Sequence, residues 1–299
     1  RTPCAICYPA RPMMQDTKDK PRRAIAAAVQ LPGASDAEIV AAFGVPHTPA
    51  FPALVKQQGP SCETALLYAE VARHLEAVQP DLLVVFDSDH LNTFFLDNLP
   101  TFAVGIAEKV VGPNDRTAMP TYTVPVDGTF ATHLFARGIR SGFDLSLLQD
   151  FTIDHSILVP LHFLTPRMNI PIVPIFVNGL VEPLPLAKRC HALGQMVRDT
   201  IEGWPAQLRV AVLASGSFSL EIGGPRIKPG GRSGTPDPGW AKRVQSHIEQ
   251  GRVDDLLNEA TSERMLAAGN IGGELLNWVS MLGVIGDRDR LRELTQRFA

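Results

Sequence analysis

The sequence predicts a single α/β domain with a central mixed, largely parallel sheet flanked by helices. Short apolar runs of strand length alternate with longer segments whose apolar residues recur at helical spacing. One run, residues 82–86, is apolar throughout, which is typical of a parallel strand covered on both faces. No break in composition divides the 299 residues, 45% of which are hydrophobic. We therefore expect one domain over residues 41–299, preceded by a proline-rich, charged N-terminal arm over residues 1–40.

The predicted elements alternate along the chain. Residues 39–43 should form a strand and residues 61–78 a helix with Ser61 as its N-cap, before the strand at 82–86. A strand, helix and strand joined by a crossover of this length form a right-handed βαβ unit, which places both strands parallel in one sheet. Further strands are expected at residues 101–106, 170–177 and 208–214, and further helices at 127–141, 186–201, 275–284 and, less sharply bounded, from Trp240 onward.

Two segments depart from this regular patterning. Pro171 and Pro174 lack the N–H groups that a strand ladder uses, so we expect the strand at 170–177 to lie at an edge or to pair irregularly. Residues 215–239 are rich in glycine and proline and should form a long surface loop, a kind of segment that is commonly functional. Its cations, Arg226 among them, could meet an anionic substrate. Alternatively, the loop is merely solvated.

Composition argues against several classes of partner. The net charge of -3 and the lack of a basic block give no electrostatic footprint for nucleic acid or an anionic membrane. No apolar run approaches the roughly 20 residues that cross a bilayer, and the first residues lack the apolar core of a secretory signal, so we expect a cytoplasmic protein. Four cysteines are too few for a disulfide framework. Cys4 and Cys7 could be half of a zinc site or a redox pair, whereas Cys62 and Cys190 are expected to be buried apolar residues.

Polar side chains collect where the predicted strands end. Asp87, Asp89 and His90 follow the strand at 82–86, and His47 follows the strand before it. Because ligands of open α/β sheets bind beyond the carboxyl ends of the strands, these side chains are placed to hold a metal ion or a substrate. The alternative is that this acidic cluster and its histidine only cap a turn.

Glu274, at the entry to the last predicted helix, adds a carboxylate to His47 and His90. Two imidazoles and one carboxylate make up the facial ligand set of non-haem Fe(II) oxygenases, which leaves adjacent positions open for a diol and dioxygen. Spacing alone does not single out this trio, because eight histidines permit many such combinations.

The contexts of these residues carry more information than their spacing. They comprise Pro46-His47-Thr48-Pro49, Asp87-Ser88-Asp89-His90 with Asn92 and Phe94-Phe95, Asp154-His155 before Pro160-Leu161, residues 173–179, and Gly273-Glu274 with Trp278. In this order they resemble the class III extradiol ring-cleaving dioxygenases, the family of the catalytic subunit of protocatechuate 4,5-dioxygenase, over about residues 40–285. The resemblance implies that His47, His90 and Glu274 bind Fe(II). It also implies that His155 forms a hydrogen bond with oxygen or substrate.

One position departs from the family pattern. The family has an acid/base histidine after the strand at 208–214, and Leu220 stands at that position. Glu221 could substitute, although adjacent side chains of an extended segment point to opposite faces. General acid/base assistance typically contributes ~10²–10⁴ in rate, so its loss could be tolerated, offset by water or made unnecessary by a more acidic substrate. We expect Leu220, Glu221 and Arg226 to line the substrate site.

The leading hypothesis is a non-haem Fe(II)-dependent extradiol dioxygenase that opens a catechol-like aromatic diol with O2. Because the acid/base histidine is missing, two alternatives stay open. One is a metal-dependent relative with lyase or hydrolase chemistry, and the other is a catalytically reduced subunit that supports an active partner. The resemblance also implies assembly, either as a homo-oligomer or in a complex with a small helical subunit.

Overall fold

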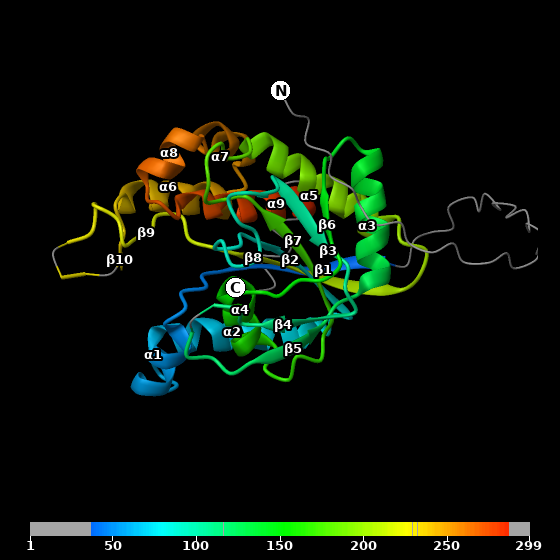
Figure 1. Ribbon diagram of the computed structural model, residues 1–299, viewed down its shortest axis with the longest axis horizontal. Coiled ribbons are helices and arrows are strands. Elements are labelled where there is room, and N and C mark those ends of the chain that lie inside the picture. The colour runs from blue at the N-terminus through cyan, green and yellow to red at the C-terminus, as the bar shows by residue number, and fades with distance from the viewer. Residues whose placement is uncertain (1–36, 116, 229, 232, 287–299) are drawn as a thin grey trace, which may run out of the picture. The chain divides into compact units, whose positions relative to one another are not determined.

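The structure, a computed structural model, describes residues 37–115, 117–228, 230–231 and 233–286, all within the unit Ala34–Ala299. At its centre lies a six-stranded sheet in the order β1-β8-β2-β7-β3-β6 (Figure 1). Its strands are β1 (Ala37–Val45), β2 (Leu82–Asp87), β3 (Phe102–Gly105), β6 (Ser146–Leu148), β7 (Ile172–Val177) and β8 (Leu208–Ser215). Strands β1, β8, β2 and β7 run parallel, β3 is antiparallel to β7, and β6 is parallel to β3. The predicted mixed, largely parallel sheet is confirmed.

The predicted N-terminal arm lies almost entirely outside the described residues, and so do Cys4 and Cys7. Strand β1 begins at Ala37, before the domain boundary expected between residues 40 and 41. The arm and that boundary stay predictions. Of the described cysteines, Cys190 is buried as expected and Cys62 is partly exposed.

The predicted βαβ unit is present, and β8 lies between its two strands. After β1 the chain forms helix α1 (Phe51–Gln58) and then α2 (Glu63–Val78), which leads into β2. Helix α2 begins after Cys62, which has the extended backbone of an N-cap residue but makes no capping hydrogen bond with its side chain. The prediction of Ser61 as N-cap was therefore wrong, because the helix starts one residue later than the apolar spacing suggested.

Strand β7 lies inside the sheet, so the expectation of an edge position was wrong. Leu83 of β2 donates to the Pro171 carbonyl, so by strand alternation the nitrogen of Pro174 faces β3 on the other side. The register with β3 runs from Ile175 to Val177. The missing N–H of Pro174 therefore falls just outside that ladder, and an interior strand tolerates the proline.

Helices cover both faces of the sheet and enclose two separate apolar clusters (Figure 1). One face carries α3 (Gly128–Arg140), α5 (Ala187–Glu202), α6 (Pro238–Glu249), α7 (Val253–Glu259), α8 (Ser262–Ala267) and α9 (Leu275–Ile285), and the other carries α1, α2, α4 (His155–Leu164) and the hairpin of β4 (Lys109–Gly112) and β5 (Tyr122–Pro125). Helices α5 and α9 pack backbone to backbone: a Cβ added at Gly194 would lie 1.9 Å from the Ser280 carbonyl oxygen. This close packing fixes the start of α9 beyond the sheet.

The glycine- and proline-rich segment after β8 is a loop, as predicted, apart from one short antiparallel pair. That pair joins β9 (Glu221–Ile222) and β10 (Ser233–Gly234). Farther on, the chain makes the short 3-10 turn η1 (Gly272–Glu274), which delivers Glu274 to the start of α9. None of the described helices is long and apolar enough to cross a membrane.

Candidate metal centre

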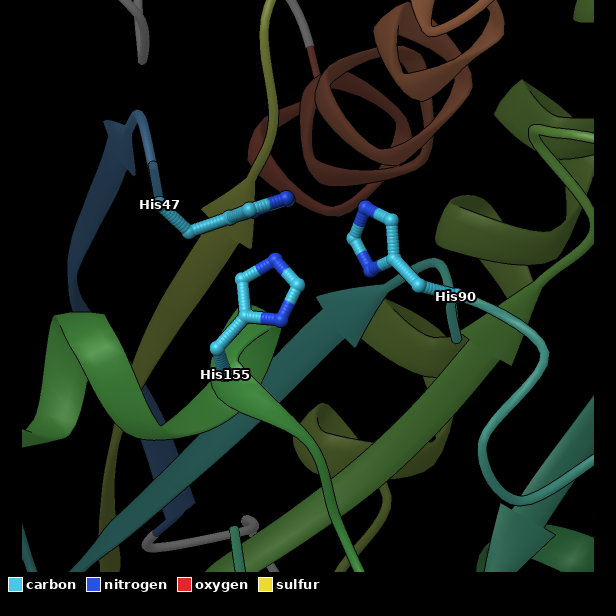
Figure 2. Close-up of side chains that lie close together, drawn as sticks. All are labelled: His47, His90 and His155. Atoms are coloured by element: carbon cyan, nitrogen blue, oxygen red, sulfur yellow. The ribbon is translucent and has the colours of Figure 1, made fainter. Parts of the chain in front are cut away.

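Three imidazoles meet beyond the carboxyl ends of the parallel strands. His47 follows β1, His90 follows β2 and His155 begins α4, and Figure 2 shows a nitrogen of each ring turned toward the space between them. One nitrogen of each ring lies within 4.8 Å of the other two. The cluster thus joins segments that are far apart in the sequence. It lies at the carboxyl ends of the strands, where ligands of open α/β sheets bind.

Glu274 completes the cluster from the 3-10 turn before α9. Its Oε1 lies 3.0 Å from Nε2 of His47 and 3.1 Å from Nε2 of His90. Its Oε2 accepts a hydrogen bond from the Ser217 N–H at 2.8 Å, and the carboxylate is fully buried. Two donor atoms at right angles and about 2.1 Å from one ion are about 3 Å apart, so these separations fit ligands of a common metal ion.

The hydrogen positions on two of the imidazoles follow from their partners. Ser215 donates its hydroxyl hydrogen to the Ser156 carbonyl at 2.8 Å, so at 2.7 Å it accepts a hydrogen bond from Nδ1 of His47. Nδ1 of His90 lies 3.2 Å from the carboxylate of Asp154, to which it donates. Each Nδ1 therefore carries a hydrogen, and each ring in its neutral form directs the lone pair of Nε2 at the buried glutamate.

The charges of these residues suit the arrangement to a cation. Burial raises the pKa of Glu274, but His47 and His90 outweigh it and lower the pKa to about 2, so the carboxylate is ionised. Burial lowers the pKa of His47, and the carboxylate offsets this only in part, so the neutral form is favoured. Burial acts likewise on His90, but Asp154 and Glu274 raise its pKa well above the ordinary value. Without a metal, a His90 imidazolium can donate to the carboxylate. With both rings neutral, their Nε2 lone pairs and the carboxylate make a donor set that fits a divalent ion.

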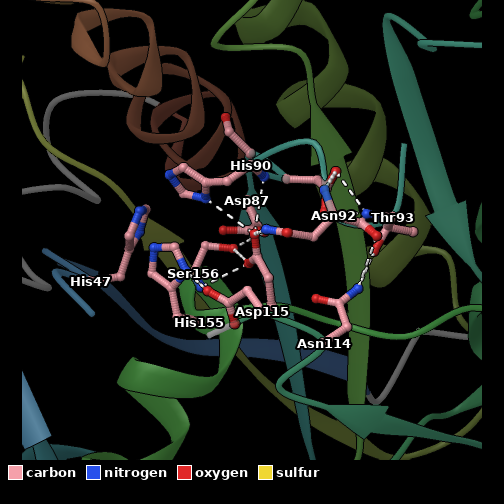
Figure 3. Close-up of polar contacts among 12 residues, drawn as sticks. His47, Asp87, His90, Asn92, Thr93, Asn114, Asp115, His155 and Ser156 are labelled. Carbon is pink, nitrogen blue, oxygen red and sulfur yellow. Dashed lines mark hydrogen bonds and ion pairs between the residues drawn. The ribbon is translucent and has the colours of Figure 1, made fainter. Parts of the chain in front are cut away.

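Asp154 anchors His90. Its Oδ2 accepts the His90 backbone N–H and the Asn92 side-chain amide, each at 3.0 Å, and its Oδ1 accepts the Ser156 N–H as the N-cap of α4 (Figure 3). The Ser156 hydroxyl contacts both Asp154 and Asp87 with a single hydrogen. Burial and the charge of Asp154 raise the pKa of Asp87 well above its ordinary value, and the hydrogen bond from Ser156 offsets this only in part. Asp87 thus lies beside the hydrogen bonds through which Asp154 anchors His90.

Of the two roles considered for Asp89, ligand binding and turn capping, the hydrogen bonds indicate turn capping. Its carboxylate accepts the backbone N–H groups of Asn92, Thr93 and Phe94 at 3.0 to 3.1 Å. Leu91, inside this turn, has a left-handed φ of 59°, which the capping hydrogen bonds stabilise. Asp89 therefore shapes the turn that carries His90.

Asp115, in the loop after β4, is a site residue that sequence reasoning missed. Its Oδ2 lies 2.5 Å from Nδ1 of His155, and a carboxylate can only accept in this contact. The two side chains are 14% and 9% exposed. Asp115 stands in an irregular polar segment, so no periodic pattern marks it. Only the approach of the β4–β5 hairpin to α4 reveals its role.

The three residues expected to line the substrate site lie in and around β9. Glu221 accepts hydrogen bonds from Arg226 at 2.7 Å and from the Asn270 N–H at 2.9 Å, and Arg226 also donates to two carbonyl groups at the end of α8. The Leu220 carbonyl accepts from the Ile271 N–H at 3.1 Å. These contacts tie β9 to the chain that leads into η1. A direct role of Leu220, Glu221 and Arg226 in substrate binding stays a prediction.

Comparison with known proteins identifies the class of this chain. Residues 41–298 match the family described as the catalytic LigB subunit of aromatic ring-opening dioxygenase, so the chain belongs to this family. The predicted class III extradiol resemblance is confirmed, and with it the expectation of a catechol ring-cleaving dioxygenase. Dioxygenases of this family depend on a metal, and the histidine cluster is where this chain could bind one.

Individual relatives carry a common name. The chain is 27% identical over 285 residues to a 2,3-dihydroxyphenylpropionate/2,3-dihydroxicinnamic acid 1,2-dioxygenase of Klebsiella pneumoniae subsp. pneumoniae, with 82% of this chain and 89% of that relative covered. A protein of the same name from Escherichia coli (strain K12 / DH10B) is 26% identical over 254 residues, with 73% and 80% covered. Among solved structures, an uncharacterized protein from Escherichia coli K12 is 19% identical with a TM-score of 0.48, covering 72% of this chain and 80% of that chain. That last likeness is too distant to inform the site.

Proposed function

We propose that this chain is a non-haem Fe(II)-dependent extradiol dioxygenase in which His47, His90 and Glu274 hold the iron. The observation that carries the proposal is the approach of one Glu274 oxygen to Nε2 of both rings, at 3.0 and 3.1 Å. Two neutral imidazoles and one carboxylate are the donor set that suits Fe(II) and leaves positions open for other ligands. Fe(II), when bound, supplies the Lewis acidity and the open positions at which a diol and dioxygen meet.

The chain's own residues hold these donors in place. Ser215 fixes the ring of His47 through Nδ1, Asp154 fixes that of His90, and the Ser217 N–H fixes the carboxylate. The hydrogen bond to each Nδ1 also selects the tautomer whose Nε2 can bind a metal. Burial of His47 and Glu274 keeps bulk water from competing for these two donors.

His155 is proposed as a hydrogen-bonding and proton-exchanging imidazole rather than a ligand. Its Nδ1 is held by Asp115, which leaves Nε2 to accept the proton of a diol hydroxyl or to donate a hydrogen bond to oxygen. A three-histidine ligand set is the alternative that the geometry offers, because a nitrogen of His155 also lies within 4.8 Å of the other two rings. We favour Glu274 as third ligand, since its charge offsets that of the cation and its oxygen lies closer to both Nε2 atoms.

The proposed substrates are a catechol-like aromatic diol and O2. The relatives are named for a vicinal diol whose ring carries a propionate or cinnamate side chain, so 2,3-dihydroxyphenylpropionate is the first substrate to test. A cytoplasmic location and assembly, either as a homo-oligomer or with a small helical subunit, belong to the same proposal.

Anaerobic reconstitution with Fe(II), followed by oxygen uptake on a panel of catechols, tests the reaction. We expect consumption of one O2 per diol only in the iron-loaded protein and formation of a ring-opened product. Turnover without oxygen consumption would favour the lyase or hydrolase alternative. Iron binding without turnover on any diol would favour the catalytically reduced subunit.

The role of His155 is tested with a matched pair of variants in one helix. His155→Gln should keep its iron and lose about 10²–10⁴ in kcat, the usual contribution of acid/base assistance. His162→Gln is the control, because His162 lies on the same helix and contacts the Tyr122 hydroxyl instead. Loss of iron from the His155→Gln protein would show that this histidine is a ligand and overturn the proposed set.

A further inference from the structure

The pair formed by Asp115 and His155 has a role that the ligand set does not explain. Building on the proposed function, we propose that Asp115 is the positioning residue of His155. Its carboxylate holds the hydrogen-bearing Nδ1 and turns the bare Nε2 toward the space where the substrate diol binds. The chain would thereby keep a proton acceptor at the site even though Leu220 replaces the expected histidine.

The contact itself is directional. Asp115 Oδ2 lies 2.5 Å from Nδ1 of His155, and the second oxygen, Oδ1, is buried and receives no hydrogen bond from any described residue. The imidazole is therefore the partner that this carboxylate serves. The backbone of His155 is fixed as well, because it is the first residue of α4 after the N-cap Asp154. With backbone and Nδ1 both held, the ring has one orientation, and Figure 2 shows its other nitrogen turned toward the neighbouring imidazoles.

The loop that carries Asp115 is anchored independently of the imidazole. The side-chain amide of Asn114 donates to the Asn92 carbonyl at 3.2 Å and to the hydroxyls of Thr93 and Thr152 at 3.2 and 2.8 Å (Figure 3). The Asn114 backbone N–H donates to the Ile153 carbonyl at 3.0 Å. These bonds join the loop to the turn after His90 and to the segment that enters α4. Asp115 is therefore presented to His155 by a rigid frame, as a residue that fixes a tautomer must be.

The consequence for proton transfer is explicit. When a diol hydroxyl gives up its proton, its O–H bond breaks, the oxygen keeps the electron pair, and an N–H bond forms at Nε2 of His155. The imidazolium that results faces the carboxylate of Asp115, which stabilises its charge. The same proton then returns to an oxygen of the ring-opened product, so no further reactant is needed. If Nδ1 lacked its acceptor, the ring could carry its hydrogen on Nε2, and Nε2 could then not accept the proton of the diol.

The test compares Asp115→Asn with the exposed control Asp144→Asn. Iron content, thermal unfolding and steady-state oxygen uptake are measured for both and for the parent. An asparagine can turn its amide to donate to Nδ1, which shifts the hydrogen of His155 to Nε2. We therefore expect Asp115→Asn to lose about 10²–10⁴ in kcat with iron content, melting temperature and KM unchanged. Asp144→Asn should match the parent in every measurement.

A spectroscopic measurement makes the inference independent of turnover. In Zn(II)-loaded protein with ¹⁵N-labelled histidine, the ring nitrogens of His155, assigned by their loss in His155→Gln, should report Nδ1–H in the parent and change in Asp115→Asn. An unchanged tautomer, or a fall in kcat matched by loss of iron or of thermal stability, would overturn the assignment. If the parent consumes no oxygen with any diol, the proposed function fails, while the tautomer measurement still decides the role of Asp115. Asp115→Glu, which keeps a carboxylate, should retain the parent tautomer and recover part of kcat.

Discussion

Two buried glutamates, Glu274 and Glu221, have opposite kinds of neighbour. Glu221 is 1% exposed and accepts hydrogen bonds from the Arg226 guanidinium and the Asn270 N–H. Burial raises the pKa of Glu221, but these donors outweigh it and lower the pKa below its ordinary value. Glu274 is equally buried, yet its Oε1 lies 3.0 and 3.1 Å from Nε2 of two imidazoles, whose Nδ1 atoms donate to Ser215 and Asp154.

The difference separates a carboxylate that is paired within the fold from one that is placed to bind a cation. Glu221 finds its positive partner inside the chain, so nothing further is needed to keep it ionised and buried. Glu274 accepts one backbone N–H, and its other oxygen faces two imidazoles. Its positive partner is therefore either an imidazolium, which the raised pKa of His90 favours, or a metal ion held by the carboxylate and the two neutral rings. A buried carboxylate oxygen that faces two imidazoles is thus a better sign of a metal site than burial alone.

The largest expected effect comes from replacing each glutamate by glutamine. Glu274→Gln removes the anionic ligand, so Fe(II) affinity should fall by more than the ~10–100-fold typical of losing a residue that merely orients a ligand, and oxygen uptake should fall with it. Glu221→Gln should keep its iron and instead lose about 1–3 kcal/mol of unfolding free energy, because it breaks a hydrogen-bonded charge pair. Metal titration and denaturant unfolding of both variants measure the two effects. Equal iron affinity in the Glu274→Gln and Glu221→Gln proteins would mean that Glu274 is not a metal ligand.

Two buried serines sharpen the comparison. Ser215 holds Nδ1 of His47, whereas Ser219 donates to the Ala268 carbonyl at 2.7 Å in the neighbourhood of Glu221. Ser215→Ala should lower Fe(II) affinity by about 10–100-fold, since the His47 tautomer is no longer fixed. Ser219→Ala should leave iron binding unchanged and reduce stability by about 1 kcal/mol. A Ser215→Ala protein that binds iron like the parent would mean that His47 is not held as a ligand.

Replacing Arg226, the positive partner of Glu221, also tests the comparison between the two glutamates. Arg226 donates to Glu221 and to the Leu266 and Ala267 carbonyls, so Arg226→Gln should destabilise the fold by about 1–3 kcal/mol. Because these contacts occupy the guanidinium, we expect KM for an anionic catechol such as 2,3-dihydroxyphenylpropionate to stay unchanged. Steady-state kinetics and unfolding by denaturant separate the outcomes. A raised KM with unchanged stability would restore the substrate-binding role that the sequence suggested.

Much of the fold could be predicted because its signals are local. The fully buried run of β2 and the amphipathic spacing of α2, α3 and α5 follow from short windows of sequence. The interior position of β7 could not, because whether Pro174 is tolerated depends on where its neighbour strand stops pairing. The insertion of β8 between β1 and β2 is likewise a property of the whole sheet, which no window of the sequence contains.

Some residues of the candidate site could likewise be predicted from local sequence, whereas others depend on long-range contacts. The clustering of His47, His90 and Glu274 could be predicted because they stand at element ends within phrases that resemble a family. Asp115 could not, because a single aspartate in an irregular loop gains meaning only when the hairpin folds against α4. The positive charge of Arg226 was visible in the sequence, but two of its three partners, the Leu266 and Ala267 carbonyls, lie about 40 residues farther along the chain. Long-range hydrogen bonds thus decide which polar residues act and which only hold the fold.

The smallest effect is expected from Leu220→His, which returns the residue that the family has at this position. The Leu220 carbonyl accepts the Ile271 N–H, and a Cβ at Gly269 would lie 1.9 Å from that carbonyl oxygen, so the backbone here is fixed beside the chain leading to Glu274. A histidine there would add a second base to a site that already has His155. The gain in kcat should therefore stay below about tenfold, well under the ~10²–10⁴ of a newly supplied acid/base group.

The measurement is oxygen uptake on catechol at matched iron content, with Leu220→Asn as a polar control that cannot take a proton. The double variant Leu220→His/Asp115→Asn tests whether the new histidine can replace His155 as the proton acceptor. If His155 depends on Asp115, the new histidine should restore more activity to the Asp115→Asn protein than it adds to the parent, because only there is a proton acceptor missing. A gain of ~10² or more in the parent itself would mean that His155 does not take the proton, and that the parent works without such a base.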